Sequence, residues 1–389
     1  MRIAVDATCW HNRRGYGRHA RALLRALVAM DDANRYTLFT DSADATEPWP
    51  ELAEIRILRA SVPAVQAASA DGRRSIPDMW RMSRALSDPR FDLVLFPTIY
   101  TYVPVFGHAR TLVMVHDVIA ETFPQLTVPR TAARLAWNLK GAVGRWQADA
   151  LITVSDYSRN LIVERFGMDR SRVFVVGEAA DPVFRKLESP VPGPDLRRAG
   201  VDGSHRIIAY LGGFSPHKNL EALVRAFGRL AARSKFSDVR LVMVGDISGD
   251  AFHTYYGTIA AQVARLGLEE RVALTGYLND ENVVVLLNLA SVLVLPSLME
   301  GFGLPAVEAA ACGCPVIATN ESPLASLLGE GAISIRPVEQ EIERALESVL
   351  SSEEMRRRIS QAGLTAAHSL TWDKAARQMM EVIAKVARA

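Results

Sequence analysis

Two glutamates eight residues apart, with glycines between them, form the pattern best suited to hold a ligand rich in hydroxyl and phosphate groups. Glu300 follows an apolar run, a glycine loop occupies residues 301–304, and Leu304-Pro305 opens a predicted helix that contains Glu308, because proline is tolerated in a first helical turn. Carboxylates accept hydrogen bonds from hydroxyl groups, and amides at a helix N-terminus bind phosphate oxygens. The simpler alternative is that Glu308 only stabilises the helix dipole and that Glu300 is a surface acid.

A lysine precedes another predicted helix in the same half of the chain. The segment Gly212-Gly-Phe-Ser-Pro-His-Lys-Asn219 follows an apolar run, and Lys218 comes just before a helix that begins near Leu220. A mobile ammonium group beside a helix N-terminus is a suitable clamp for a diphosphate. The alternative is a lysine that points only into solvent.

In the first half, His116 and Asp117 follow the apolar run 112–115. The neutral imidazole can both donate and accept hydrogen bonds, so His116 is a candidate contact for a polar substrate. The alternative is a loop histidine whose hydrogen bonds go to the backbone.

The glycines of Gly15-x-Gly17-x-x-Ala20 formally match a dinucleotide fingerprint, and this match supports an NAD-type oxidoreductase as an alternative. In that fingerprint the glycines lie in the tight turn at the end of the strand, whereas here residues 7–14 intervene. A longer glycine loop at a helix N-terminus can still bring amides to a phosphate. The spacing therefore favours an anion or substrate loop.

The elements that position these residues are predicted from short apolar runs separated by helical patterns. The runs are nearly continuous rather than alternating, as in strands covered on both faces, so they predict parallel sheets and an α/β class. Residues just after such strands lie where ligands bind. The predicted strands are residues 3–5, 36–39, 55–58, 93–96, 112–115, 151–154, 173–176, 207–211, 241–244, 272–274, 292–295, 316–318 and 333–335.

The number of runs predicts two doubly wound, Rossmann-like domains that face each other across a cleft. The Pro/Gly-rich segment 189–194 is typical of a linker. It divides the chain into a domain of residues 1–188 and a domain of residues 195–370. Residues 371–389 form a predicted helix that could pack back on the first domain. The stretch 60–90 is polar, Arg-rich and weakly patterned, and it is expected to be a mobile excursion from the first domain.

Composition restricts the function classes. Among 389 residues, Lys plus Arg is 45 and Asp plus Glu is 43, a balance that argues against nucleic acid as the main partner. Cys9, Cys312 and Cys314 suit neither a disulfide framework nor a zinc site, which weakly predicts a reducing, cytoplasmic location. The sequence begins without a signal-peptide pattern, and its longest apolar stretch, 283–295, is too short to span a membrane.

Contact with the surface of a membrane is a separate expectation. Residues 129–149 combine four basic side chains with two tryptophans and several leucines and alanines. A basic amphipathic helix with tryptophans suits an anionic membrane surface. The alternative is a helix packed on the sheet whose basic side chains reach out to solvent.

Taken together, these motifs resemble those of the retaining glycosyltransferases of family 4, also called glycosyl transferases group 1, which have the GT-B fold. The resemblance covers essentially the whole chain, with the motifs in the expected order. The matches are Glu-x7-Glu at 300–308, Pro-x-Lys-Asn at 216–219, His-Asp at 116–117, Gly-x-Gly-Arg at 15–18 and the serine-rich strand end at 154–159.

The resemblance implies a nucleotide sugar as co-substrate, a glycan or lipid-linked acceptor, and no separate cofactor. Lys218, Glu300 and His116 would be the catalytic residues, with Lys218 at the diphosphate, Glu300 at the donor sugar and His116 at the reacting centre. Glu308 would hold the ribose. The remaining donor-binding residues implied by the resemblance are Gly15, Gly17, Gly213, Gly301, Phe302, Gly303 and Leu304.

One position departs from the pattern, since many members carry an arginine as a second diphosphate cation where this chain has Gly213; another branch has threonine. Arg18 is the candidate for that second cation. The chain also lacks an Asp-x-Asp triplet, the usual metal ligand of the other main transferase fold, so no metal is expected. The surroundings of His116 resemble branches that build surface polysaccharides, often from GDP-mannose. A further alternative is a non-catalytic nucleotide-sugar sensor on the same fold.

Overall fold

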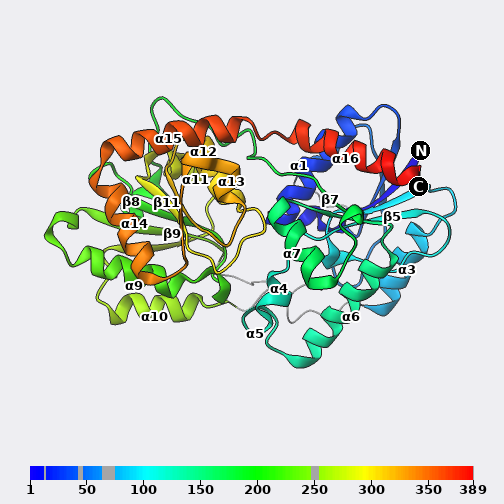
Figure 1. Ribbon diagram of the computed structural model, residues 1–389, viewed down its shortest axis with the longest axis horizontal. Helices are drawn as coiled ribbons and strands as arrows, with labels where there is room; N and C mark the ends of the chain where they lie inside the picture. Colours follow the sequence, from blue (N-terminus) through cyan, green and yellow to red (C-terminus); the bar gives the residue numbers. More distant parts are fainter. Residues whose placement is uncertain (13–14, 43–46, 64–74, 247–253, 389) are drawn as a thin grey trace. The chain divides into compact units, whose positions relative to one another are not determined.

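A computed structural model describes residues 1–389 except 13–14, 43–46, 64–74, 247–253 and 389. The chain divides into two compact units (Figure 1). Unit 1 contains residues 1–124, 128–178 and 371–389, and unit 2 contains residues 125–127 and 179–370. Each unit has its own sheet and its own buried core.

Unit 1 is built on a seven-stranded sheet in the order β3-β2-β1-β4-β5-β6-β7. Every neighbouring pair in it is parallel, in agreement with the continuous apolar character of the strand residues. The order along the chain reverses between β1 and β4. The strands are β1 (Arg2–Asp6), β2 (Arg35–Thr40), β3 (Glu54–Ile57), β4 (Leu93–Phe96), β5 (Arg110–Met114), β6 (Ala150–Thr153) and β7 (Val173–Val175).

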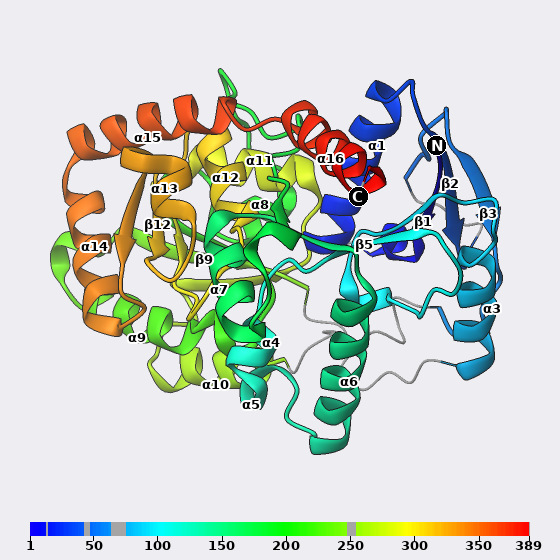
Figure 2. The ribbon, with the colours of Figure 1, turned by 45° about the vertical axis from the view of Figure 1, so that its right-hand side comes forward.

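Helices flank this sheet (Figure 2). Helix α1 buries Leu23, Leu24, Leu27 and Val28, whose spacing places them on one face, and the final helix α16 packs against α1. The helices of unit 1 are α1 (Gly15–Met30), α3 (Ile76–Leu86), α4 (Ile119–Thr122), α6 (Thr131–Gln147), α7 (Asp156–Phe166) and α16 (Trp372–Ala387), and the short helix α5 (Pro124–Thr127) belongs to unit 2 except for its first residue.

Unit 2 is built on a six-stranded sheet in the order β10-β9-β8-β11-β12-β13, again parallel throughout. Here the order along the chain reverses between β8 and β11. The strands are β8 (Arg206–Leu211), β9 (Val239–Val244), β10 (Val272–Gly276), β11 (Val292–Leu295), β12 (Val316–Thr319) and β13 (Ala332–Ile335).

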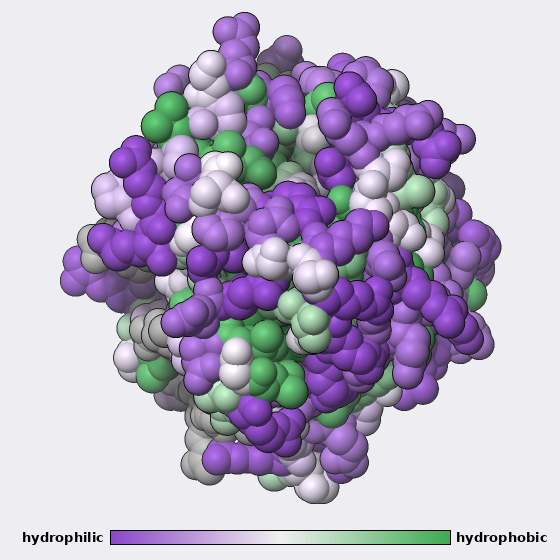
Figure 3. Space-filling view, turned by 90° about the vertical axis from the view of Figure 1, so that its left-hand side faces the viewer, coloured by the Kyte–Doolittle hydropathy of each residue, from purple (hydrophilic) through white to green (hydrophobic). Residues whose placement is uncertain are grey.

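The helices of unit 2 pack in groups on this sheet, with α9 against α10 and α14, and α12 against α15. Ion pairs join α9 to α14 from Arg225 to Glu339 and from Arg229 to Glu343, and Arg233, just after α9, pairs with Glu347 of α14. The face drawn in Figure 3 is mostly hydrophilic, with small hydrophobic patches. The helices are α8 (Pro194–Arg198), α9 (Leu220–Ala231), α10 (Tyr256–Arg265), α11 (Asp280–Leu289), α12 (Leu304–Ala311), α13 (Leu324–Leu328), α14 (Glu339–Ser351) and α15 (Glu353–His368).

The strands predicted from apolar runs are all confirmed, within two residues at each end. The chain passes between the units at Glu178, however, and the predicted linker at 189–194 lies within unit 2. Asn288 of α11 accepts a hydrogen bond from the Leu187 amide at 2.8 Å and donates one to the Arg185 carbonyl, which ties this segment to unit 2. No helix of the described residues is long and apolar enough to cross a membrane.

The stretch 60–90, expected to be a mobile excursion from the first domain, contains helix α3. Ser75 caps α3 by accepting a hydrogen bond from the Asp78 amide, and a proline stands in the first turn. Residues 64–74 lie outside the described part of the chain.

Candidate functional site

The loops that carry the lysine and the first glutamate leave the same edge of the unit 2 sheet. Strands β8 and β11 are neighbours, with Val292 paired to Ile208, and the strand order reverses between them. In doubly wound sheets, ligands bind outside the carboxyl ends of the strands at such a reversal. Topology therefore brings together two loops that are about 80 residues apart in sequence.

Lys218 and Glu300 form an ion pair at this edge. The Lys218 Nζ donates to Glu300 Oε1 at 2.8 Å, and the hydroxyl of Ser297 donates to the same oxygen at 2.6 Å. Glu300 is buried and Lys218 is half-buried. A carboxylate with a cation and a hydroxyl on one oxygen is held in a single orientation, and its other oxygen remains available as an acceptor.

Asn219 fastens the lysine loop to its neighbours. Its backbone adopts the left-handed conformation, with φ of 58°, at the start of α9. The side-chain amide donates to the carbonyl of Pro296 at 3.0 Å and to that of Pro337 at 2.8 Å. The amide of Leu298 also donates to the carbonyl of His217 at 2.8 Å. These bonds fix the loop of Lys218 against the loop of Glu300.

Glu308 lies in α12, which follows the glycine loop as predicted. Gly303 precedes the helix with φ of 88°, and a Cβ there would stand 2.8 Å from the side chain of Leu324, so the position requires glycine. Gly301, Phe302 and Gly303 are buried, and Leu304 and Gly213 are half-buried. Glu308 is also buried. That Glu308 shares one ligand cavity with Lys218 and Glu300 stays a prediction.

His217, next to the lysine, is a buried imidazole. Burial lowers its pKa to about 3, and the charge of Lys218 acts in the same direction. The ring is therefore neutral at physiological pH, and Lys218 is the charged partner of Glu300.

His116 lies at the carboxyl end of β5 in unit 1. Its Nε2 is 3.1 Å from the carbonyl oxygen of Pro97, which follows the neighbouring strand β4. Its Nδ1 is 3.6 Å from Oε1 of Glu178. The side chain of His116 is largely buried, with 12% of its surface exposed. The predicted histidine thus belongs to a cluster that reaches across several strands.

Glu178 and His19 form the buried part of this cluster. The Nδ1 of His19 is 2.8 Å from the same Glu178 oxygen, and both side chains are almost completely buried. The ring of His19 packs edge-on against the rings of His116 and Trp372. Burial alone would raise the pKa of Glu178, but the two histidines outweigh it and lower that pKa to about 2. Burial also lowers the pKa of His19.

The glycines of the first loop lie in a helix and not in a tight turn. A short 3-10 helix, η1 (Thr8–His11), separates β1 from α1, which begins at Gly15. A Cβ on Gly17 would stand 2.0 Å from the carbonyl oxygen of Asn12, so the close approach of the two segments requires glycine there. Arg18 follows in the same helical turn and is half-buried. Its role as a second diphosphate cation stays a prediction.

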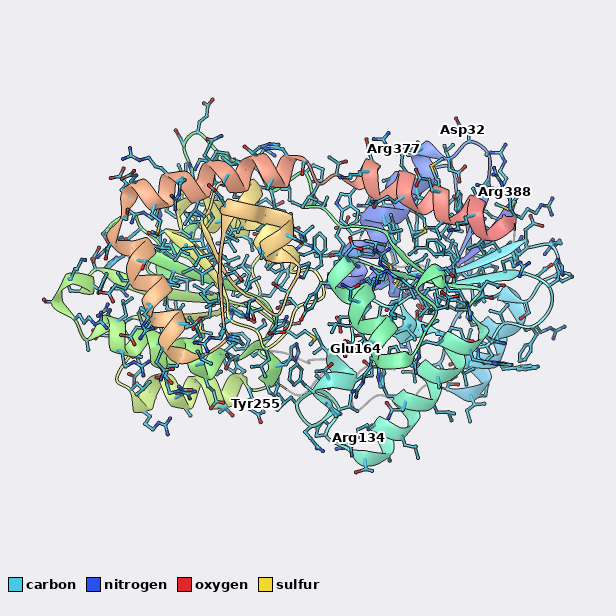
Figure 4. The ribbon with its side chains drawn as sticks, in the orientation of Figure 1. Asp32, Arg134, Glu164, Tyr255, Arg377 and Arg388 are labelled. Atoms are coloured by element: carbon cyan, nitrogen blue, oxygen red, sulfur yellow. The ribbon has the colours of Figure 1, made fainter. Side chains whose placement is uncertain are left out.

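Helix α6 spans most of the segment expected to touch a membrane, but its basic side chains do not form its outer face. Lys140 donates to the carbonyl of Tyr100, and the guanidinium of Arg145 lies 3.7 Å from the ring centre of Phe166. Arg134, on the first turn (Figure 4), is half-buried. The exposed residues of α6 are all uncharged: Thr131, Ala132, Leu135, Ala136, Asn138, Leu139, Ala142 and Trp146.

Of the described residues, His19, His116 and Glu178 could also hold a metal ion, because their ligand atoms lie within 4.8 Å of one another. The short contact between His19 and Glu178 satisfies that carboxylate without an ion. The prediction that no metal takes part is left untested by this geometry. Cys9, Cys312 and Cys314 are free and buried.

Several residues of these two clusters were not predicted from the sequence. His19 and Glu178 stand beside recognised positions, since His19 follows Arg18 and Glu178 closely follows β7. Inspecting every residue just after a strand would have found Glu178. Ser297, which donates to Glu300, gave no such signal.

Comparison with known families agrees with this geometry. Residues 13–183 match the model of Glycosyltransferase Family 4, and residues 195–365 match that of Glycosyl transferases group 1. The chain belongs to this family of GT-B glycosyltransferases. An NAD-type oxidoreductase is not supported, in line with the helical position of the glycines.

Curated relatives carry several glycosyltransferase names. A D-inositol 3-phosphate glycosyltransferase of Nocardia farcinica is 28% identical over 60% of this chain and 52% of its own length. A serotype-specific mannosyltransferase, WbdA of Escherichia coli, is 25% identical over 60% of this chain and 28% of its own length. The match thus spans about half of the first relative and less of the second.

Solved structures share the fold along the whole chain. Sucrose-phosphate synthase of Thermosynechococcus elongatus superposes with a TM-score of 0.78 at 19% identity, covering 99% of both chains. HepE of Anabaena, in complex with UDP-glucose, has a TM-score of 0.73 at 17% identity and also covers 99% of both chains. At these identities the likeness shows the two-domain GT-B fold.

Proposed function

We propose that the protein is an enzyme that transfers a sugar from a nucleotide diphosphate sugar to a hydroxyl group, with retention of the anomeric configuration. The observation that carries this proposal is the ion pair of Lys218 with Glu300 at the reversal of the unit 2 sheet. Family membership supports the same reaction class. A nucleotide-sugar sensor would share the fold, and turnover of a donor separates the two functions.

In the proposed reaction, the bond between the anomeric carbon and the diphosphate oxygen breaks, the acceptor oxygen forms the new bond to that carbon, and the proton of the acceptor hydroxyl passes to the leaving diphosphate. The leaving diphosphate gains negative charge in the transition state. Lys218 and the amides at the start of α12 stabilise that charge more than the ground state. Glu300 accepts hydrogen bonds from the donor sugar, Glu308 from the ribose, and His116 acts at the reacting centre.

The donor is proposed to be GDP-mannose, for a role in the synthesis of surface polysaccharides. The mannosyltransferase among the relatives supports this choice. A neighbour of the same fold was solved with UDP-glucose, so UDP-sugars are the competing donors. The acceptor is a glycan or a lipid-linked glycan.

Catalysis is proposed to need no metal, because Lys218 and helix-end amides supply the positive charge. Full activity in EDTA supports this, whereas loss of activity in EDTA that Mg²⁺ or Mn²⁺ restores would overturn it.

The outer face of α6 supports contact with a membrane. Leu135, Leu139 and Trp146 expose 71%, 65% and 81% of their surface, and they stand four and seven residues apart on one face. A lipid-linked acceptor lies at such a surface, so we place the enzyme in the cytoplasm at the inner face of the membrane. The three free buried cysteines suit a reducing compartment. The apolar exposed face indicates that the helix binds by inserting apolar side chains and less by charge.

The experiment that tests the reaction is donor turnover by Lys218→Ala. Loss of one contact to the developing charge costs about 10²–10³-fold in rate, so kcat/KM should fall by that factor. Lys235→Ala is the matched control, since Lys235 contacts Ser351 on the exposed side of unit 2, and its kcat/KM should be unchanged. A Lys218→Ala variant that keeps more than about a tenth of the wild-type kcat/KM would exclude Lys218 from the mechanism.

A further inference from the structure

Lys218 and Glu300 have different tasks in the proposed reaction, yet in the structure they are bonded to each other. The Lys218 Nζ stands 2.8 Å from Glu300 Oε1, and within the described part of the chain it is the cation that pairs with this carboxylate. The two charges cancel at a distance, so an ammonium group that stays on the carboxylate attracts a diphosphate only weakly. An ammonium group that leaves Glu300 attracts it with its full charge.

The two side chains differ in how far they can move. The side chain of Lys218 is 21% exposed and that of Glu300 is 10% exposed, and lysine carries its charge on a flexible four-carbon stem. The His217 carbonyl accepts from the Leu298 amide at 2.8 Å, and the Asn219 side chain donates to two loop carbonyls, so the backbone on both sides of the lysine is fixed. The ammonium group is therefore the member of the pair that can change its partner.

Glu300 has a second partner that does not depend on the lysine. The Ser297 hydroxyl donates to Glu300 Oε1 at 2.6 Å, and Ser297 is completely buried. The Glu300 amide also donates to the Glu321 carbonyl at 2.9 Å, which fixes its backbone. A buried carboxylate that loses its cation is strongly destabilised unless a hydrogen bond remains. Ser297 supplies that bond.

We propose that donor binding moves the Lys218 ammonium group from Glu300 to the diphosphate, and that Ser297 is the positioning residue that holds Glu300 during this exchange. The exchange rests on the proposed function and adds a release step to it. After sugar transfer the nucleoside diphosphate remains, and Glu300 competes with it for the ammonium group. The carboxylate therefore weakens binding of the product and favours its release.

The first test measures the binding of nucleoside diphosphates without a sugar, by isothermal titration calorimetry with GDP, UDP and ADP as probes. Glu300→Gln keeps the size of the side chain and removes its charge, so the ammonium group no longer has to leave an ion pair. A partly buried pair of this kind changes an equilibrium constant by about 3- to 10-fold. The variant should therefore bind its probe more tightly than the wild type by that factor.

Removing a negative charge near the diphosphate could tighten binding even if the lysine never moved, and a double-mutant cycle separates the two causes. Lys218→Met keeps the length of the stem and removes the ammonium group. In that background, Glu300→Gln should not tighten binding, because there is no ammonium group to exchange. Equal tightening by Glu300→Gln with and without the lysine would show direct repulsion and overturn the exchange.

Ser297→Ala should act in the opposite direction. Without the hydroxyl, a departing lysine leaves the Glu300 carboxylate unpaired, so the probe should bind about 3- to 10-fold more weakly. In the Glu300→Gln background the same substitution should have little effect on affinity. Ser360→Ala is the matched control, because Ser360 donates to the Gly313 carbonyl at 2.6 Å elsewhere in unit 2. A serine with only a structural role would lower the melting temperature and leave the affinity of the folded protein unchanged.

The outcomes separate this inference from the proposed function. A wild type that binds none of the three nucleotides overturns the proposed function and the exchange with it. A wild type that binds one of them, with unchanged or lower affinity in Glu300→Gln, overturns the exchange alone. If Glu300→Gln fails to fold, Ser297→Ala decides, and an unchanged affinity in that variant overturns the exchange.

Discussion

His217, next to Lys218 in sequence, has a neutral ring, so Lys218 remains the charged partner of Glu300 in the unit 2 loops. His217 is buried, and its pKa is lowered to about 3 by burial and by Lys218. A charged ring there would compete with the lysine for Glu300. Its backbone carbonyl meanwhile accepts from Leu298, so the residue joins the two loops whichever state its ring is in.

The lowered pKa of His217 makes folding sensitive to acid. In the unfolded chain the ring takes up a proton below pH 6.5, while the folded ring stays neutral down to about pH 3. The unfolded state thus binds more protons in this window, and stability falls as pH falls through it. At pH 5 the loss from this ring is about 2 kcal/mol.

The change that tests this is His217→Asn, which removes the titrating ring. Urea unfolding at pH 7.5 and at pH 5 should show a smaller stability difference for the variant than for the wild type, by about 2 kcal/mol. His19 is present in both proteins, so its contribution to the loss of stability in acid is the same in both and cancels in the comparison. If both proteins lose the same free energy of unfolding between pH 7.5 and pH 5, His217 is not the cause of the sensitivity to acid.

In helix α6, the basic side chains lie on the inner face and uncharged side chains lie on the outer face, the opposite of an ordinary amphipathic helix. Two of its basic side chains, Lys140 and Arg145, contact Tyr100 and Phe166 within unit 1, and its exposed side chains are uncharged. The sequence left two possibilities open: basic side chains that face an anionic membrane surface, or a helix packed on the sheet whose basic side chains reach out to solvent. The backbone and aromatic partners that hold them inward lie far away in sequence, so the pattern of the helix itself could not reveal them.

The variant Leu135→Gln, Leu139→Gln, Trp146→Gln tests the membrane contact of α6. Burying one large apolar side chain contributes about 1.5–3 kcal/mol, so the triple variant should bind vesicles containing anionic lipid at least about tenfold more weakly. Co-sedimentation at low salt measures this. Leu52→Gln, an exposed leucine of unit 1 outside α6, should bind like the wild type. A wild-type protein that stays in the supernatant would rule out the membrane contact.

At the scale of the molecule, the strands were predictable because parallel strands buried on both faces leave continuous apolar runs. The meeting of Lys218 with Glu300 was predictable for a related reason, since both follow strands at the edge where ligands bind. The cluster of Glu178 with His19 was not, because it depends on contacts between distant segments. The position of the boundary between the units, at Glu178, could not be predicted either, because the Pro/Gly-rich segment 189–194 has the composition of a linker.

The net charge of the chain is close to zero, so general attraction of an anionic donor contributes little. In the proposed function, specific contacts must therefore supply the affinity, and Lys218 is the cation proposed to bind the diphosphate. A ligand at about 100 times its Kd stabilises a protein by about 2.7 kcal/mol, which raises the melting temperature measurably.

The most direct measurement is therefore thermal unfolding of the wild type and Lys218→Ala with GDP-mannose, UDP-glucose and ADP-glucose. We predict that at least one of these donors raises the melting temperature of the wild type, and that the same donor at the same concentration gives Lys218→Ala a clearly smaller shift. If none of the three stabilises the wild type, or if Lys218→Ala is stabilised equally, Lys218 and Glu300 do not form a nucleotide-sugar site.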